Sequence, residues 1–421
     1  MKLQMHSSRR KFLGSIAGAG TMIMLKPPAW AFDDVDPRVA AIVASTIGID
    51  THNHIDVPLT RDEVPGPTID LAGEMKRSGL SAVCMTFAVD YQQLRNPGDA
   101  YDRFKNGLTS MDQQLERNHM KRSLNLADLR AAHEKKRPTV VQSVEGAHFL
   151  EGRQERVEEA YNRGLRHFGL LHDSDASVPL GDVYTNPPRW GGLTEFGAKV
   201  IKECNRLGIL VDLAHANAET VVAALKVTTK PVIISHTGLD SQLGQNPSMA
   251  RMMRARLISK EQAKIVADAG GVIGVWTHLA DSPVEYAQNV RALVDVIGID
   301  HVCIGTDTKL TPGNGPRGGP GPRPGGDPGG RRDGGPGGNG PGAPGRGPMA
   351  DGPGGGPGGG PNRGRAGERT NDAWQGETVG FYDAVVSAML RVGFTADEIG
   401  KVGGGNFCRE PSASLHDSAQ E

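Results

Sequence analysis

The sequence predicts an α/β fold, a closed (β/α)8 TIM-type barrel with a disordered Gly/Pro-rich insertion after its eighth strand. Two observations favour this fold. From residue 45 onward, short β-rich runs alternate with longer amphipathic stretches, as strands and helices do in a barrel. The chain has 421 residues, which is long enough for one large barrel. A doubly wound open sheet is the competing topology, but no Gly-rich phosphate-binding fingerprint follows the first strand.

The eight predicted strands share short length and a β-rich composition: Ile47–His54, Ala82–Phe87, Thr139–Glu145, His167–Leu171, Ile209–Ala214, Pro231–Ser235, Val272–Val275 and His301–Asp307. Helical periodicity separates them, as in Leu193–Leu207, Lys260–Ala269 and Val284–Val296. It resumes over Glu377–Val392. We therefore expect one barrel domain over residues 45–410.

Residues 311–369 interrupt this domain. They read as repeated Gly-Pro-Gly-Gly with scattered Arg and Asp, and no strict Gly-x-y period indicates collagen. Such a composition cannot bury a core, so we expect a disordered loop. It leaves the barrel where barrel enzymes keep active-site loops. An inert spacer is one interpretation, and a role in substrate access or partner binding is the other.

Charge and cysteine usage exclude several classes. The formal net charge is -1, which gives no general attraction to nucleic acid. The four cysteines, Cys84, Cys204, Cys303 and Cys408, form no Cys-x-x-Cys pair, so neither a zinc ribbon nor a redox motif is indicated. We expect them to be buried small hydrophobic residues, although a disulfide stays open.

The first 31 residues are typical of a twin-arginine export signal. Ser8-Arg9-Arg10-Lys11-Phe12-Leu13 precedes a weakly apolar stretch and then Ala29-Trp30-Ala31, a small-x-small cleavage site. The apolar stretch is short for a membrane span, and a basic N-terminal anchor is the alternative. We expect a periplasmic or otherwise exported protein, without a stable transmembrane segment once mature.

Polar residues end most of the predicted strands: His52 and His54, Glu145, His172, His215, His236 and Asp307. The carboxyl ends of barrel strands meet at one rim, where barrel active sites lie. A single histidine of this kind is more often a structural core residue. Their recurrence from strand to strand instead indicates a metal centre, because imidazole and carboxylate are ligands of zinc and similar ions.

The first two histidines have a geometry of their own. His52 and His54 are two apart on a strand, so both point to one face and can bind one metal ion. A carboxylate that bridges two ions would let them activate a shared hydroxide and polarise a carbonyl. A further carboxylate could then shuttle protons, and a free histidine could stabilise the oxyanion.

The sequence resembles the membrane (renal) dipeptidase family, zinc peptidases with a (β/α)8 fold. The matching stretches are Asp50-Thr51-His52-Asn53, Val144-Glu145-Gly146-Ala147-His148, Gly192-Leu193-Thr194-Glu195-Phe196-Gly197, Leu210-Val211-Asp212-Leu213-Ala214-His215, Pro231-Val232-Ile233-Ile234-Ser235-His236, Gly270-Gly271-Val272-Ile273-Gly274-Val275, Ile304-Gly305-Thr306-Asp307 and Gly405-Asn406-Phe407. The resemblance covers nearly all of residues 45–410 outside the insertion.

The resemblance implies two divalent metal ions, most simply Zn²⁺, and a role for each residue. It implies that His52 binds the first ion, that Glu145 bridges, and that His215 and His236 bind the second. His54 stands where the family has an aspartate, and by its spacing from His52 it can still bind the first ion. His172 would sit over the substrate carbonyl and Asp307 would act as the proton shuttle, which makes these two the catalytic pair. Arg256 would hold the substrate carboxylate, with Arg254 as the alternative.

One residue departs from the family pattern, which is His-x-Asp where this chain has His52-Asn53-His54. The metal cluster becomes more positive by one charge, and a bridging water should become more acidic. The leading hypothesis is an exported zinc-dependent dipeptidase that cleaves dipeptides or similar small amides, a small-molecule substrate. The alternatives are an amidohydrolase-type enzyme acting on a non-peptide amide, lactone or ester, and an inactive envelope binding protein. A homo-oligomer stays open.

Overall fold

The computed structural model of the protein describes residues 36–64, 66, 68–311 and 369–409. The predicted export signal, residues 1–31, lies outside this part of the chain. So do residues 312–368, which make up nearly all of the predicted insertion.

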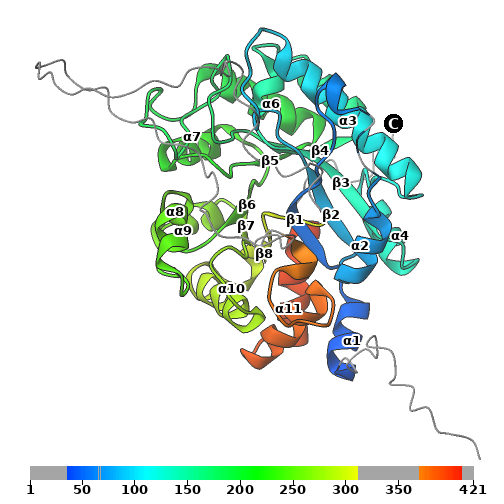
Figure 1. Ribbon diagram of the computed structural model, residues 1–421. Helices are drawn as coiled ribbons and strands as arrows, with labels where there is room; N and C mark the ends of the chain where they lie inside the picture. Colours follow the sequence, from blue (N-terminus) through cyan, green and yellow to red (C-terminus); the bar gives the residue numbers. More distant parts are fainter. Residues whose placement is uncertain (1–35, 65, 67, 312–368, 410–421) are drawn as a thin grey trace, which may run out of the picture. The chain divides into compact units, whose positions relative to one another are not determined.

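Eight parallel strands close into a barrel ringed by helices (Figure 1), and the predicted fold class is confirmed. The strands are β1 (Ile49–His54), β2 (Ala82–Thr86), β3 (Thr139–Val144), β4 (Leu165–Gly169), β5 (Leu210–Asp212), β6 (Ile233–Thr237), β7 (Val272–Val275) and β8 (Val302–Ile304). The ring closes because β1 pairs with both β2 and β8. A short ninth strand, β9 (Thr308–Lys309), pairs with the end of β1.

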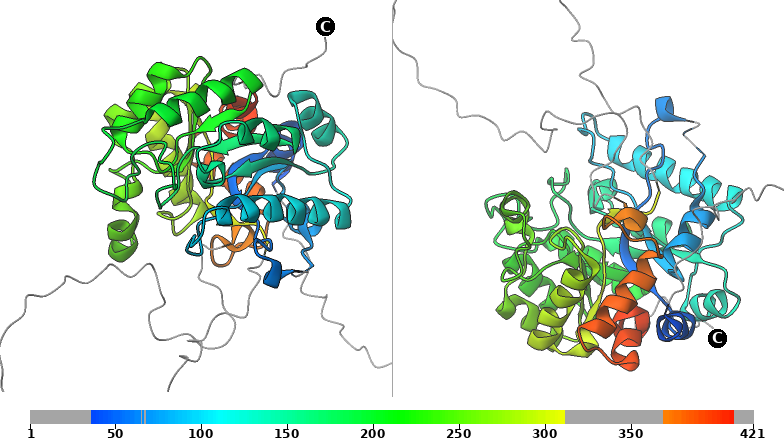
Figure 2. Two further views of the ribbon diagram at one scale, coloured as in Figure 1. Left: turned by 90° about the horizontal axis from the view of Figure 1, so that it is seen from above. Right: turned by 60° about the horizontal axis from the view of Figure 1, so that its bottom comes forward.

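The helices follow the strands as the sequence predicts and form the outer layer in all views (Figure 2). They are α1 (Pro37–Ser45), α2 (Leu71–Ser78), α3 (Asp99–Arg117), α4 (Leu126–Glu134), α5 (Arg156–Asn162), α6 (Glu195–Leu207), α7 (Ala218–Val227), α8 (Pro247–Met253), α9 (Lys260–Asp268), α10 (Pro283–Ile297), α11 (Phe381–Arg391), α12 (Ala396–Gly400) and α13 (Asn406–Arg409). No helix in the described part of the chain combines the length and apolar character needed to cross a bilayer.

Helix starts are set by local hydrogen bonds that the sequence encodes. Thr194 caps α6 by accepting from the Gly197 N–H, and Asn217 caps α7 by accepting from the Thr220 N–H. Ser259 and Gln262 form a reciprocal capping box at the start of α9. These caps place the first turns of α7 and α9 beside the carboxyl ends of β5 and β6.

Several strand boundaries differ from the prediction. Strand β4 begins two residues earlier, at Leu165, and ends at Gly169. Strand β6 begins at Ile233, because Pro231 cannot donate to the ladder, and it extends to Thr237. His236 therefore lies inside a strand and not after one. Strand β8 ends at Ile304, and the chain then turns through Asp307 at φ 54°.

Buried apolar side chains from seven of the eight strands fill the end of the barrel interior opposite the polar strand ends. They are Ile49, Ala82, Cys84, Val141, Leu210, Ile233, Val272 and Cys303, with Phe407 of α13 packed against them. All four cysteines are free thiols, and Cys84, Cys204 and Cys303 are buried. The prediction that the cysteines are buried small hydrophobic residues is confirmed for these three, whereas Cys408 is half-buried. Because apolar side chains fill that end of the barrel, the polar residues lie at the other end, where the strands have their carboxyl termini.

Candidate metal centre

The polar strand ends converge on Glu145, which directly follows β3. Its Oε1 lies 2.8 Å from Nε2 of His215, 3.4 Å from Nε2 of His52 and 3.7 Å from Nε2 of His236. Its Oε2 lies 3.4 Å from Nε2 of His172 and 3.6 Å from Nε2 of His54. The geometry predicted from the sequence is therefore observed: five histidines from four strand ends face one buried carboxylate.

The two histidines of β1 do point to one face, as their spacing predicts. Their Nε2 atoms are 3.3 Å apart, and the side chain of His52 is almost completely buried. His215 and His236 form a second such pair, with Nε2 atoms 3.1 Å apart. Both pairs bring nitrogen to nitrogen, which two neutral rings tolerate only when a proton or a cation lies between them.

A buried hydroxyl determines which nitrogen of His52 and His236 carries the proton. The Ser235 hydroxyl donates to Asp212 Oδ2 at 2.6 Å, so its lone pairs face the two rings. Nδ1 of His52 lies 3.2 Å from this oxygen and Nδ1 of His236 lies 2.9 Å from it. Both Nδ1 atoms must then donate, and both Nε2 atoms offer lone pairs to the centre.

A carboxylate and two hydroxyls orient the rings of His215 and His54. Asp173 Oδ1 accepts from Nδ1 of His215 at 2.9 Å and from the Tyr184 hydroxyl at 2.7 Å. The Tyr91 hydroxyl lies 3.0 Å from Nδ1 of His54. His215 itself has a left-handed backbone, φ 67°, which is uncommon for a non-glycine residue. The Nε2 lone pairs therefore converge on one point from several directions.

These residues fit divalent cations. Within the described chain, Glu145 Oε2 is buried and has no hydrogen-bond donor, and an anionic oxygen in that state needs a positive partner. Three overlapping groups have ligand atoms close enough to share an ion: His52 with Glu145 and His236, His52 with His54 and Asp307, and Glu145 with His172 and His215. Imidazole nitrogen with carboxylate oxygen is a donor set typical of zinc.

The pKa shifts in the cluster also indicate that its buried carboxylate is anionic and needs positive charge beside it. Burial alone would raise the pKa of Glu145, but His172, His52 and His215 together hold that pKa well below its ordinary value. Burial opposes protonation of His215 and His52, yet Glu145 and nearby carboxylates raise their pKa to about 10 and about 9. Without metal, protons occupy part of the space where cations fit.

Asp307 lies beside the His52–His54 pair. Its Oδ1 is 3.2 Å from Nε2 of His54, and its Oδ2 is 2.9 Å from Nε2 of His278. Its backbone is left-handed, φ 54°, and its N–H donates to the His52 carbonyl at 3.2 Å. Burial raises the pKa of Asp307, but histidines led by His236 and His278 outweigh it and hold the pKa well below the ordinary value.

Of the two candidate arginines, Arg256 lies at this site. Its Nη2 is 2.7 Å from Asp173 Oδ2, and the other oxygen of that carboxylate holds the metal-facing His215. Arg254 is exposed. Asp173 thus joins Arg256 to the histidine cluster, and the geometry favours Arg256 over Arg254 as the candidate arginine of the site.

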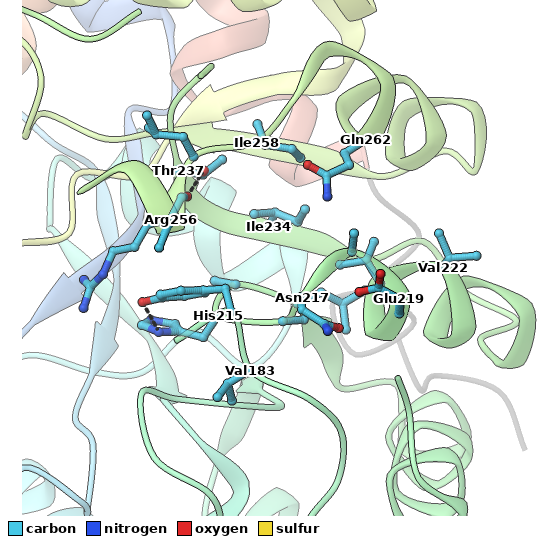
Figure 3. Close-up of a pocket in the computed structure, with 18 of the residues that line it drawn as sticks. Val183, His215, Asn217, Glu219, Val222, Ile234, Thr237, Arg256, Ile258 and Gln262 are labelled. Atoms are coloured by element: carbon cyan, nitrogen blue, oxygen red, sulfur yellow. Dashed lines mark hydrogen bonds between the residues drawn. The ribbon is translucent and has the colours of Figure 1, made fainter. Parts of the chain in front are cut away.

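A cavity of about 290 Å³ lies beside the cluster, between the ends of β5 and β6 and the first turns of α7 and α9 (Figure 3). Its walls include His215, Arg256 and Ile234, and Gln262 points toward it from α9. Polar and apolar groups contribute similar shares of the wall, so the cavity offers hydrogen-bonding groups beside apolar surface to part of a small molecule.

The sequence interpretation did not single out several of these residues: Asp90, Tyr91, Asp173, Tyr184, Asp212, Ser235 and His278. They hold the histidines or Asp307, and most of them lie in loops after the strands. Asp173 directly follows His172, and Ser235 directly precedes His236. A polar neighbour of a proposed ligand was the available signal, because metal-binding histidines need a partner for their second nitrogen.

The profile of the family described as membrane dipeptidase, peptidase family M19, matches residues 37–315. The chain belongs to this family. Family M19 is metal-dependent, and the His and Glu groups described above can hold metal. A dipeptidase from Clonostachys rogersoniana, verJ, is 30% identical over 171 residues, which is 39% of this chain and 41% of that relative's length.

Solved structures support the M19 fold. An amidohydrolase from Pseudomonas aeruginosa is 20% identical, with a TM-score of 0.61 over 90% of this chain and 98% of that one. A probable dipeptidase from the same organism is 14% identical, with a TM-score of 0.63 and the same coverage. A metallo peptidase from Rhodobacter sphaeroides, liganded with a phosphinate mimic of L-Ala-D-Ala, is 16% identical, with a TM-score of 0.56 over 88% and 99% of the chains.

Proposed function

We propose that this M19 member is a dinuclear zinc dipeptidase that cleaves the amide bond of dipeptides or similar small amides. The observation that carries the proposal is the buried, donor-free Oε2 of Glu145 at the meeting point of five histidines. His52 and His54 would hold one ion and His215 and His236 the other, with Glu145 shared between them. When bound, such ions lower the pKa of a water molecule and polarise a carbonyl.

The chain's own residues would divide the remaining work. Asp307 would accept a proton from the attacking water and deliver it to the leaving amine nitrogen. His172, whose Nε2 faces Glu145 Oε2 at 3.4 Å, would donate a hydrogen bond to the oxygen of the tetrahedral intermediate. Arg256 would hold the substrate carboxylate, and its pairing with Asp173 keeps the guanidinium beside the site.

The size of the adjoining cavity favours a small substrate. About 290 Å³ accommodates one amino-acid residue but not a folded chain. The named relatives agree with this class: verJ is a dipeptidase, and the Rhodobacter sphaeroides peptidase was solved with a dipeptide mimic. We infer that the cavity receives the C-terminal residue of the substrate, with its carboxylate toward Arg256.

Metal reconstitution with a dipeptide library tests the proposal. Purified mature protein, stripped with a chelator, should regain about two equivalents of Zn²⁺ and hydrolyse at least some L,L- or L,D-dipeptides. Failure to bind metal would contradict the enzyme proposal and favour the alternative of an inactive envelope binding protein. Full metal loading without turnover of any dipeptide would move the substrate to a non-peptide amide, lactone or ester, the class that His54 in place of aspartate would favour.

We also propose that residues 1–31 direct export by the twin-arginine route and that the mature barrel works in the periplasm or outside the cell. The support is the sequence Ser8-Arg9-Arg10-Lys11-Phe12-Leu13 followed by a weakly apolar stretch. Replacing both Arg9 and Arg10 by lysine should leave the protein in the cytoplasmic fraction of a bacterial host. Unchanged export of this variant would contradict the proposal.

A further inference from the structure

Asp90 lies in the connection between β2 and α3 and reaches back to His172. Its side chain is 4% exposed, and its Oδ1 lies 2.6 Å from Nδ1 of His172. Its Oδ2 accepts from the Ser174 hydroxyl, also at 2.6 Å, and lies 3.5 Å from Nε2 of His148. Both carboxylate oxygens are therefore engaged in a nearly water-free setting.

We propose that Asp90 is a positioning residue, which holds the His172 imidazole with Nε2 directed at the reacting carbonyl. This inference rests on the proposed function, in which His172 contacts the tetrahedral intermediate. Asp90 itself does not touch the substrate; it acts through the ring.

The argument begins with hydrogen-bond direction. A carboxylate can only accept, so Nδ1 of His172 must carry a hydrogen and donate it to Asp90. The opposite nitrogen, Nε2, then points toward Glu145, 3.4 Å from its Oε2. Because Nε2 must also donate to the tetrahedral intermediate, His172 acts there as an imidazolium with a hydrogen on both nitrogens, and Asp90 is its counter-ion. A buried carboxylate orients a catalytic histidine and stabilises its imidazolium in hydrolase triads in the same way.

Ser174 prevents the carboxylate from rotating. Because its hydroxyl donates to Oδ2, a turn of the carboxylate about its Cβ–Cγ bond would break two short hydrogen bonds at once. Hydrogen bonds to an ionised group are about twice as strong as neutral ones. The pKa of Asp90, which burial would raise, is instead lowered, mainly by His172.

The backbone behind His172 is equally restricted. Gly146 adopts φ 79°, and a Cβ atom there would lie 2.9 Å from Cβ of His172 and 2.7 Å from Nδ1 of His148. The β3 end thus contacts His172 from one side while Asp90 holds it from the other. The ring has one orientation that satisfies both.

Three variants test the proposal in the zinc-loaded full chain: Asp90→Asn, Asp90→Ala and Asp90→Glu. We expect Asp90→Asn, which replaces one accepting oxygen by an NH₂ donor and removes the negative charge, to lower kcat by about 10²-fold or more, because a misoriented catalytic group costs about this much. Asp90→Ala should lower it as far. KM and zinc content should change little, and Asp90→Glu should recover part of kcat.

Two further readouts separate positioning from stability. Affinity for a phosphinate dipeptide mimic, a tetrahedral analogue, should fall with kcat in Asp90→Asn. Asp182→Asn is the matched control. Asp182 is also buried, and in the described part of the chain its carboxylate accepts from backbone N–H groups of the β4–α6 loop and from no side chain. The substitution should lower the melting temperature without changing kcat or phosphinate affinity.

Near-wild-type kcat and phosphinate affinity in Asp90→Asn would overturn the proposal. The same holds if Asp90→Asn is inactive only because it has lost zinc.

An NMR signal tests the hydrogen bond directly. The Nδ1–H proton of His172 should give a downfield resonance that is absent in His172→Gln and disappears in Asp90→Ala. That signal does not depend on turnover. A wild-type protein inactive on dipeptides would contradict the proposed function, whereas absence of the resonance in wild type would contradict the role of Asp90.

Discussion

His54 is the residue at which this chain departs from the pattern of its family. Its Nε2 lies 3.2 Å from Asp307 Oδ1 and 3.3 Å from Nε2 of His52, so these three side chains are close enough to share an ion. The neutral ring makes the cluster one charge more positive than an aspartate would. The nearby Asp307 carboxylate compensates part of that charge.

His54→Asp should restore the family charge without removing a ligand. We expect the acidic limb of the pH profile of kcat/KM to move up by about one unit, because an added anion near the ions opposes loss of a proton from bound water. Zinc content should stay at the wild-type value. His54→Ala is the control for loss of a ligand, and it should lose one equivalent of metal. An unchanged pH profile in His54→Asp would contradict the charge argument.

Asp307→Asn tests the proton shuttle. The amide keeps the size of the side chain but cannot take up a proton, so kcat should fall on the order of 10²- to 10⁴-fold. Zinc analysis decides the role, because Asp307 also lies within ligand distance of His52 and His54. Retained zinc supports the shuttle, whereas loss of an equivalent would make Asp307 a ligand. Near-normal turnover would remove it from the mechanism.

At the level of elements, the ends of β6, β7 and β8 approach one another too closely for side chains. A Cβ atom at Gly305 or Gly274 would collide with the carbonyl oxygen of Ser235, the residue before the candidate ligand His236. The Thr51 hydroxyl donates to the same carbonyl at 3.0 Å. Glycine at these two positions lets β6 place Ser235 between His52 and His236.

Gly305→Ala should therefore lower the free energy of unfolding by about 1–3 kcal/mol, the usual cost of overpacking. It should also weaken zinc binding, because the Ser235 carbonyl must shift. Gly400→Ala in α12 is a suitable control, since its Cβ would meet only a Thr46 methyl at 3.3 Å. Denaturant unfolding and zinc competition measure both effects. Equal stability of the two variants would contradict this account.

For the whole molecule, the metal-free protein should lose stability as pH rises. Folding raises the pKa of His215 from 6.5 to about 10 and of His52 to about 9, against burial and mainly through Glu145. A raised pKa stabilises the fold fully below pH 6.5, and this contribution disappears as pH rises through 9 and 10. The lowered pKa values of Glu145 and Asp307 add no slope in this window.

Thermal unfolding after chelation should therefore show a melting temperature that falls between pH 6.5 and 10. The zinc-loaded protein should show a much smaller change, because metal-bound imidazoles are already neutral. Its melting temperature serves as the control for effects elsewhere in the chain. A flat profile in the metal-free protein would contradict the assignment of protons to His52 and His215.

The two ends of the Gly/Pro-rich segment lie side by side. Lys309 forms a β-bridge with Arg369, and the Thr308 and Thr370 hydroxyls are 2.8 Å apart. Replacing residues 315–366 by a short Gly-Ser linker should leave the melting temperature nearly unchanged, because their composition cannot contribute a core. A changed KM would favour the interpretation that the segment controls substrate access. Failure to fold would contradict the spacer and access interpretations alike.

The barrel and most of the candidate site could be predicted from the sequence alone. Strand periodicity and alternation with helices reflect local burial patterns, and a polar residue at an apolar strand's end must lie at the barrel rim. The predicted strand boundaries were wrong where contacts with a neighbouring strand decide them. His236 lies inside β6 because pairing with β7 continues that strand to Thr237.

Only the tertiary structure revealed the partners that orient the site. Asp90 is 82 residues from His172 in sequence, and Ser235 is 183 residues from His52, so no local pattern relates them. Barrel closure brings them within hydrogen-bond distance. The sequence by itself determined which residues could bind metal, because ligand chemistry belongs to residue type. The tautomers and orientations of those ligands depend on contacts between distant strands, and only the folded barrel decides them.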